Sequence, residues 1–189
     1  VTEAGTSDPS APATARPDAK PNQPAVPTTK FGDRVIDLSW PATTVPDGGS
    51  PVTQYKIQVS PGINGQTEFT TADTAWQATG LSNGTAYRFR IQALNRYAEG
   101  NVARESEYLW SDYSAPEIPA GAPTGQGAPT VNKNKASGAA PSATVSWGAP
   151  GDANGDRSFV YELRESGSGE VKYSGPATST TVTMSVSSE

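Results

Sequence analysis

The sequence contains neither histidine nor cysteine. Without imidazole or thiol groups, the chain cannot build a Ser-His-Asp triad, a thiolate nucleophile, a Cys/His zinc site or an iron–sulfur site. It cannot form disulfide bonds either, so cysteine usage does not indicate the redox compartment. Phosphate-binding loops and dinucleotide-binding fingerprints are also missing. We therefore expect no enzyme activity, no cofactor and no metal site in this segment.

Positive charge is also in short supply. The chain has 14 Lys and Arg residues against 19 Asp and Glu residues, which gives a net charge of −5. General nucleic-acid binding and adhesion to anionic lipids both need a basic surface, so we expect neither. No apolar run approaches the roughly 18–20 residues of a membrane span, so we expect no membrane insertion. Because the chain begins with Val1 and shows no signal peptide, we interpret it as a segment of a longer protein.

Glycine and proline, by contrast, are abundant, with 19 and 17 residues. Both residues destabilise helix interiors, so this composition favours β-structure and loops. Prolines recur among Ala, Thr and Ser within residues 1–27, which predicts an extended, mobile linker. Residues 120–128 are rich in Gly and Pro and predict a second, shorter linker.

Short segments of alternating apolar and polar residues begin at Thr28 and are separated by turn-forming clusters. This pattern is typical of an antiparallel sandwich. The pattern returns after residue 128, because Trp147 follows Trp40 by about a hundred residues, and Tyr161 follows Tyr55 by a similar interval. We therefore predict two copies of one small domain, at 28–119 and 129–189.

Three motifs of the first predicted domain resemble the fibronectin type III family. They are Ser39-Trp40-Pro41, the loop Asp47-Gly48-Gly49-Ser50-Pro51, and the corner Leu81-x-x-Gly84-Thr85-x-Tyr87. The resemblance implies an all-β, immunoglobulin-like antiparallel β-sandwich, present as two units in tandem. It also implies that the hydroxyl of Tyr87 bonds back to nearby backbone.

The second predicted domain resembles the family only in part. Ser146-Trp147 and Tyr161-x-Leu163 fit, and residues 178–184 predict its fifth strand. The last two strands of the family's fold are absent, which would leave a strand edge uncovered. We favour a fragment boundary as the explanation, and the alternative is that another segment donates the missing strands.

The run Trp110-Ser111-Asp112-Tyr113-Ser114 resembles the Trp-Ser-x-Trp-Ser box of class I cytokine receptors, with Tyr113 in place of the second Trp. The resemblance implies that its aromatic rings interleave with cationic side chains of neighbouring strands. We expect this cation–aromatic ladder to be either structural or adjacent to a ligand site. Its predicted members are Trp110, Ser111, Tyr113, Ser114, Arg88, Arg90 and Lys56.

The polar stretch 96–108 is long for a hairpin loop and contains Tyr97, Arg104 and Tyr108. Tyr and Arg are favoured at binding hot spots, so we predict that these three residues contact a protein partner. The loop at 41–51 would lie at the same end of the domain. The alternative interpretation is a solvated, variable loop.

The family resemblance implies a monomeric, extracellular or cell-surface module, and the Ala/Thr/Pro-rich linkers suggest a Gram-positive bacterium. The favoured function is recognition of a protein partner, and the receptor-like box suggests a host cytokine. The alternative is a passive spacer within a larger surface protein or polysaccharide-degrading enzyme.

Overall fold

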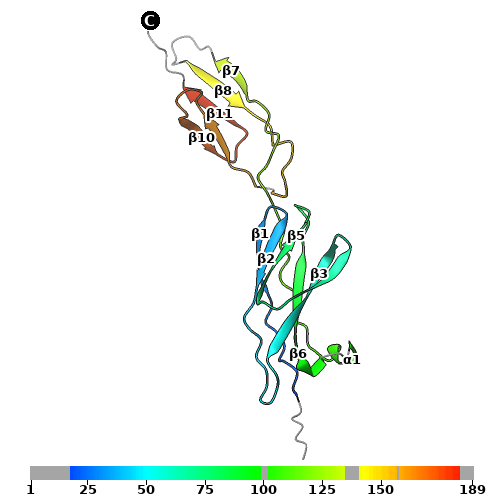
Figure 1. Ribbon diagram of the computed structural model, residues 1–189. Coiled ribbons are helices and arrows are strands. Elements are labelled where there is room, and N and C mark those ends of the chain that lie inside the picture. The colour runs from blue at the N-terminus through cyan, green and yellow to red at the C-terminus, as the bar shows by residue number, and fades with distance from the viewer. Residues whose placement is uncertain (1–17, 99–101, 135–140, 157, 184–189) are drawn as a thin grey trace, which may run out of the picture. The chain divides into compact units, whose positions relative to one another are not determined.

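The computed structural model describes residues 18–98, 102–134, 141–156 and 158–183 (Figure 1). Within them, regular structure is almost entirely β, apart from a helical turn η1 at Arg96–Ala98 and a short helix α1 at Val102–Glu105. The chain divides into two compact units. One comprises Val1–Thr28, Ser39–Trp76 and Arg88–Ser114, and the other Thr29–Leu38, Gln77–Tyr87 and Ala115–Glu189.

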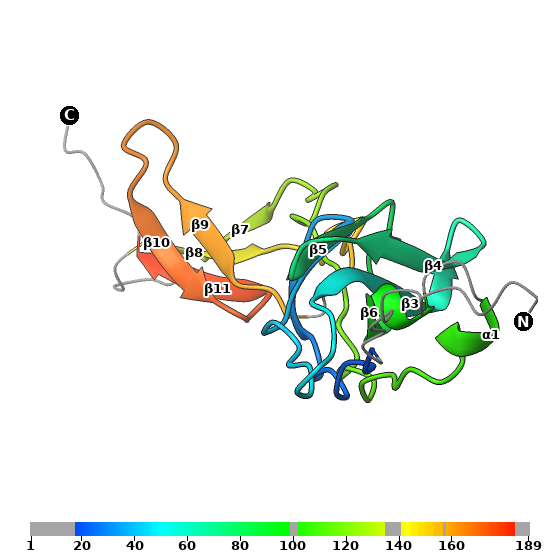
Figure 2. The same cartoon turned by 60° about the horizontal axis from the view of Figure 1, so that its bottom comes forward.

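The first unit contains a three-stranded antiparallel sheet in the order β4-β3-β6 (Figure 2). Its strands are β3 at Val52–Ile63, β4 at Gln66–Thr71 and β6 at Arg88–Asn95. The turn between β3 and β4 has positive φ at Asn64 and Gly65, 50° and 83°, which a tight hairpin requires. In the register, Gln58 of β3 lies opposite Glu68 of β4 and Arg90 of β6.

Alternation along these strands separates a buried face from a polar one. Ile57 of β3 and its partner Ile91 of β6 are fully buried, and so is Phe89. The indole of Trp40 meets the ring of Tyr55 edge-on, with 5.4 Å between centroids. Because successive strand residues point to opposite faces, Gln58 and Arg90 lie on the outer face of the sheet.

A second antiparallel sheet has the order β1-β2-β5. Its strands are β1 at Thr28–Gly32, β2 at Val35–Ser39 and β5 at Ala75–Thr79, and they bury Ile36, Leu38 and Ala78. The backbone N–H of Ser82 donates to the hydroxyl of Tyr87 over 3.1 Å, which confirms the predicted corner. The predicted all-β antiparallel sandwich is likewise confirmed.

The C-terminal segment forms two further antiparallel sheets, one with β7, β8 and β11 and one with β9 and β10 (Figure 2). The bounds are β7 Thr130–Asn134, β8 Ser142–Ser146, β9 Tyr161–Arg164, β10 Val171–Gly175 and β11 Ser179–Thr183. β11 lies within the strand predicted at 178–184. The order β7-β8-β11 joins the first, second and fifth strands of this segment, as β1-β2-β5 does in the preceding one.

Residues 18–27 differ from the mobile linker predicted from their composition. Pro21, Pro24 and Pro27 are buried, and the backbone N–H of Asn22 donates to the carbonyl of Thr44 over 3.0 Å. An extended polyproline conformation repeats every three residues, so these three prolines share one face. The buried proline face gives residues 18–27 an apolar contact with the rest of the domain, although the segment contains few large apolar residues.

Candidate recognition surface

Residues 110–114 run beside β6. They bond to it partly through backbone groups, as a regular strand would, and partly through side-chain hydroxyls. The N–H groups of Ser111 and Ser114 donate to the carbonyls of Ile91 and Phe89, over 2.8 and 2.7 Å. In return, the N–H groups of Ile91 and Phe89 donate to the hydroxyls of Ser111 and Ser114, over 3.0 and 3.1 Å. Both serines are buried, whereas the two residues between them, Asp112 and Tyr113, are exposed. The two hydroxyls therefore accept the hydrogen bonds that backbone carbonyls accept in a regular strand pair. The dipeptide between the two serines is left free to project outward.

Both aromatic residues of the box, Trp110 and Tyr113, lie against Arg90. The guanidinium carbon of Arg90 lies 4.9 Å from the ring centre of Trp110 and 4.8 Å from that of Tyr113. Gln58 fixes the arrangement, because its Oε1 accepts hydrogen bonds from Nε of Arg90 and from the hydroxyl of Tyr113, over 2.7 and 2.9 Å. Two cation–π contacts and these hydrogen bonds hold the guanidinium in one orientation.

The other two predicted cations of the ladder have different surroundings. Lys56 forms an ion pair with Glu105 of α1. Arg88 lies opposite Ser60 at the exposed start of β6, and none of the aromatic rings that the structure describes covers it. The structure therefore gathers Trp110, Tyr113 and Arg90 into one cluster, to which Arg88 and Lys56 do not belong.

The loop 96–108 contains a second aromatic and cationic cluster. The guanidinium of Arg104 lies 5.0 Å from the ring centre of Tyr97, and the hydroxyl of Tyr97 donates to Glu107 over 2.8 Å. That hydrogen bond to a carboxylate, followed by burial and the charge of Glu107, raises the pKa of Tyr97 above its ordinary value. The exposed side chain of Arg104 and the partly exposed ring of Tyr97 are thus held in place.

Tyr108 differs from the prediction. Its side chain is only 3% exposed, and its hydroxyl donates to Oδ1 of Asn95 over 2.8 Å. Its ring packs edge-on against that of Tyr97, with 6.0 Å between the ring centroids. Tyr108 therefore supports the loop from the protein interior and is not part of the surface that a protein partner could contact. Leu109, the next residue, is 53% exposed and is an apolar surface position that sequence reasoning missed.

Residues 18–24, here called the N-terminal strap, connect the loop 41–51 to the loop 96–108. Lys20 donates through Nζ to the carbonyl of Glu107, and Gln23 donates through Nε2 to the carbonyl of Trp110, both over 2.9 Å. At the other end, both oxygens of the Asp18 carboxylate accept hydrogen bonds from Ser50, 2.6 Å from its N–H and 2.7 Å from its hydroxyl. The order of this segment could have been predicted from the regular spacing of its prolines, which recur every three residues. The overall amino-acid composition does not show that spacing.

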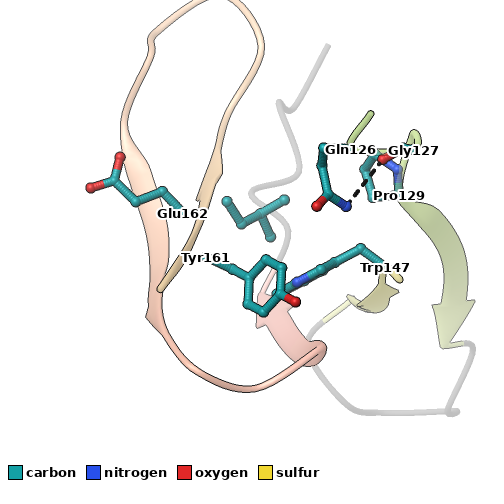
Figure 3. A pocket seen from close by; sticks show the side chains of 7 residues that line it. Gln126, Gly127, Pro129, Trp147, Tyr161 and Glu162 are labelled. Carbon is teal, nitrogen blue, oxygen red and sulfur yellow. Dashed lines mark hydrogen bonds between the residues drawn. The ribbon is translucent and has the colours of Figure 1, made fainter. Parts of the chain in front are cut away.

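The C-terminal segment has a small open pocket of about 100 Å³ beside β9 (Figure 3). Trp147 and Tyr161 line it, and their rings lie 5.9 Å apart. Both remain partly exposed, whereas their counterparts Trp40 and Tyr55 are 5% and 3% exposed. The remaining lining residues are Gln126, Gly127, Pro129, Glu162 and Leu163. Among the described residues β9 pairs with β10 alone, whereas β3 of the preceding segment pairs with both β4 and β6.

Three comparisons place the chain among known proteins. Residues 20–108 match the family model of the fibronectin type III domain. A protein of Aedes aegypti named as the receptor-type tyrosine-protein phosphatase mosPTP-1 is 30% identical over 159 residues, which cover 78% of this chain and 11% of that protein. The chain therefore spans about a tenth of that relative. A crystal structure of titin domains A168–A170 covers 52% of this chain and 32% of its own, with 21% identity and a TM-score of 0.41.

Fibronectin type III domains are generally non-catalytic modules that bind proteins or act as spacers, and they occur in extracellular and receptor regions. No helix in the described parts of the chain is long and apolar enough to cross a membrane. The matched segment includes the Trp40 strand, the Tyr87 corner and the β4-β3-β6 sheet. Residues 20–108 are a fibronectin type III domain.

Proposed function

We propose that the chain is a non-catalytic module of an extracellular or cell-surface protein and recognises a protein partner. The surface is formed by Tyr97, Arg104 and Leu109, here called the loop surface. The observation that carries the proposal is the contact between Arg104 and Tyr97. Leu109, which follows the loop 96–108 in sequence, is 53% exposed. Arginine and aromatic residues held on a rigid sandwich supply binding energy at low entropic cost.

The partner class follows from the receptor-like box, which suggests a host cytokine bound by a monomeric module. The Ala/Thr/Pro-rich segments support an origin in a secreted or surface protein of a Gram-positive bacterium. The receptor-type name of the Aedes aegypti relative supports an extracellular location. We also propose that the repeated first-second-fifth strand order reflects two domains in tandem, joined by a linker at 120–128.

A binding assay of the chain against a panel of immobilised cytokines tests the recognition proposal. We expect at least one cytokine to bind, and Tyr97→Ala combined with Arg104→Ala to reduce that binding by about 2 kcal/mol or more. Lys133→Ala on β7 is the matched control, because it removes one exposed cation elsewhere and should leave binding unchanged. Absence of binding to any of the cytokines, or equal binding by both variants, would overturn the proposal.

A passive spacer is the second candidate, and the strand order repeated in successive segments favours it. A spacer separates neighbouring domains without contacting a ligand, so its loop residues are free to change. Replacing this chain in its parent protein with an unrelated sandwich of equal length should then leave the parent's function intact. Loss of function after that exchange would contradict the spacer.

A further inference from the structure

We propose that Arg90, Trp110 and Tyr113 form a binding site for a single carboxylate side chain of a peptide segment whose neighbouring residues are neutral. The site lies on the outer face of the β4-β3-β6 sheet and does not include the loop surface. Its elements are a fixed guanidinium, two aromatic rings within 5 Å of its central carbon, and the amide of Gln58.

The first reason is the incomplete hydrogen bonding of Arg90. Its Nε is engaged by Gln58, but neither Nη1 nor Nη2 has an acceptor among the described residues. No carboxylate in the described ranges lies within 4 Å of it, whereas Lys56 on the neighbouring strand is paired with Glu105. Arg90 is therefore a half-buried cation with an open edge of N–H donors.

The second reason is geometric. A guanidinium held through its Nε and its π contacts leaves the edge formed by Nη1 and Nη2, and that edge matches the two oxygens of a carboxylate. Because Gln58 and the rings already fix the side chain, binding costs little additional side-chain entropy. Tyr113 is 37% exposed, so its ring can also contact the aliphatic stem of a glutamate.

The third reason is the charge around the site, which favours one carboxylate over a polyanion. Asp112 projects beside Tyr113, and Glu68 lies on the far side of Gln58, where it accepts a hydrogen bond over 3.3 Å. These acidic neighbours and the net charge of −5 repel densely charged polymers such as nucleic acids. A carboxylate flanked by neutral residues avoids that repulsion.

The test is a titration of the chain with N-acetyl-glutamate N-methylamide, followed through the NMR signals of the Arg90 Nε–H and the Trp110 indole N–H. The matched probe is N-acetyl-glutamine N-methylamide, and sodium sulfate tests for a free inorganic anion. We expect both signals to shift saturably with the glutamate probe only. The variant Arg90→Lys should weaken that binding by about tenfold, since lysine lacks the planar fork, and Arg88→Lys should not change it.

Equal shifts with the glutamine probe, or equal affinity of Arg90→Lys, would overturn the site. Tighter binding of sulfate than of the glutamate probe would overturn the assignment to a carboxylate. If Arg90→Lys disturbs the amide spectrum, the comparison of the two probes on the unaltered chain still decides. Cytokine binding is measured separately at the loop surface, so failure of one proposal does not affect the other.

Discussion

At the scale of single residues, Ser111 and Ser114 stabilise the edge of the sheet through their hydroxyl groups. Each hydroxyl accepts the hydrogen bond of a buried β6 amide that would otherwise need a backbone carbonyl. Resemblance to the receptor box predicts that Arg88, Arg90 and Lys56 interleave with its aromatic rings. It did not indicate that only Arg90 would meet the rings, because the positions of Lys56 and Arg88 depend on long-range contacts such as that with Glu105.

Ser111→Ala should lower the free energy of unfolding by about 1–3 kcal/mol, because the buried N–H of Ile91 loses its acceptor. Chemical denaturation followed by tryptophan fluorescence measures the change. Asp112→Ala is the control, since its exposed side chain should change stability by less than about 0.5 kcal/mol. Equal stability of the two variants would show that water satisfies the amide.

Trp110→Ala should lower stability by about 1–2 kcal/mol, since it removes a ring that stacks on Arg90 and shields the sheet. The neighbouring exposed residue Leu109 provides the control variant Leu109→Ala. The measurement is thermal unfolding by calorimetry. A loss no larger than that of Leu109→Ala would mean that Trp110 contributes little to the fold and is available to a ligand.

At the scale of elements, the sequence was informative wherever alternation alone sets the structure. Tyr87, Phe89 and Ile91, which alternate with arginines in the sequence, are buried positions just before and along β6. The N-terminal strap was missed because a proline-rich segment has no apolar alternation to detect. Its order comes from partners distant in sequence, such as Ser50 for Asp18 and Trp110 for Gln23.

The N-terminal strap should loosen in acid. Hydrogen bonds from the side chain and backbone of Ser50 lower the pKa of the Asp18 carboxyl below its ordinary value. A carboxyl with a depressed folded-state pKa contributes stability above its unfolded pKa and loses it as the pH falls through the folded one. The stability difference between the unaltered chain and Asp18→Asn should therefore be largest above about pH 5 and shrink below about pH 4.

Denaturation midpoints measured across this pH range test that dependence. Asp37→Asn is a matched control, because it removes an exposed carboxylate of β2 that lies outside the strap. The opposing result is a stability difference between Asp18→Asn and the unaltered chain that stays constant from pH 7 to about pH 3. That result would show that the ionised form of Asp18 does not stabilise the strap.

At the scale of the whole molecule, the two Trp–Tyr pairs show how unequal the two segments are. The pair Trp40 and Tyr55 is buried, whereas the pair Trp147 and Tyr161 remains partly exposed. In the sequence, the second segment repeats the early motifs of the first, with Ser146-Trp147 and Tyr161-x-Leu163.

Hydrogen exchange should reveal this inequality directly. We expect the amides of Ile57 and Ile91 to exchange only through global unfolding, because both side chains are fully buried in a three-stranded sheet. The amides of Tyr161 and Leu163 should exchange at least about a hundredfold faster, because β9 has one strand partner among the described residues. Equal protection of both pairs would contradict the expectation.

The segment 110–114, which bonds to β6 through Ser111 and Ser114, also has a consequence for aggregation. A regular edge strand presents a row of free amides and carbonyls on which another copy can polymerise. Here two amide positions of β6 are occupied by side-chain hydroxyls, and a bulging dipeptide interrupts the outer rim. A module crowded at high local concentration is therefore protected at this edge from edge-to-edge aggregation, and the exposed carboxylate of Asp112 adds to that protection.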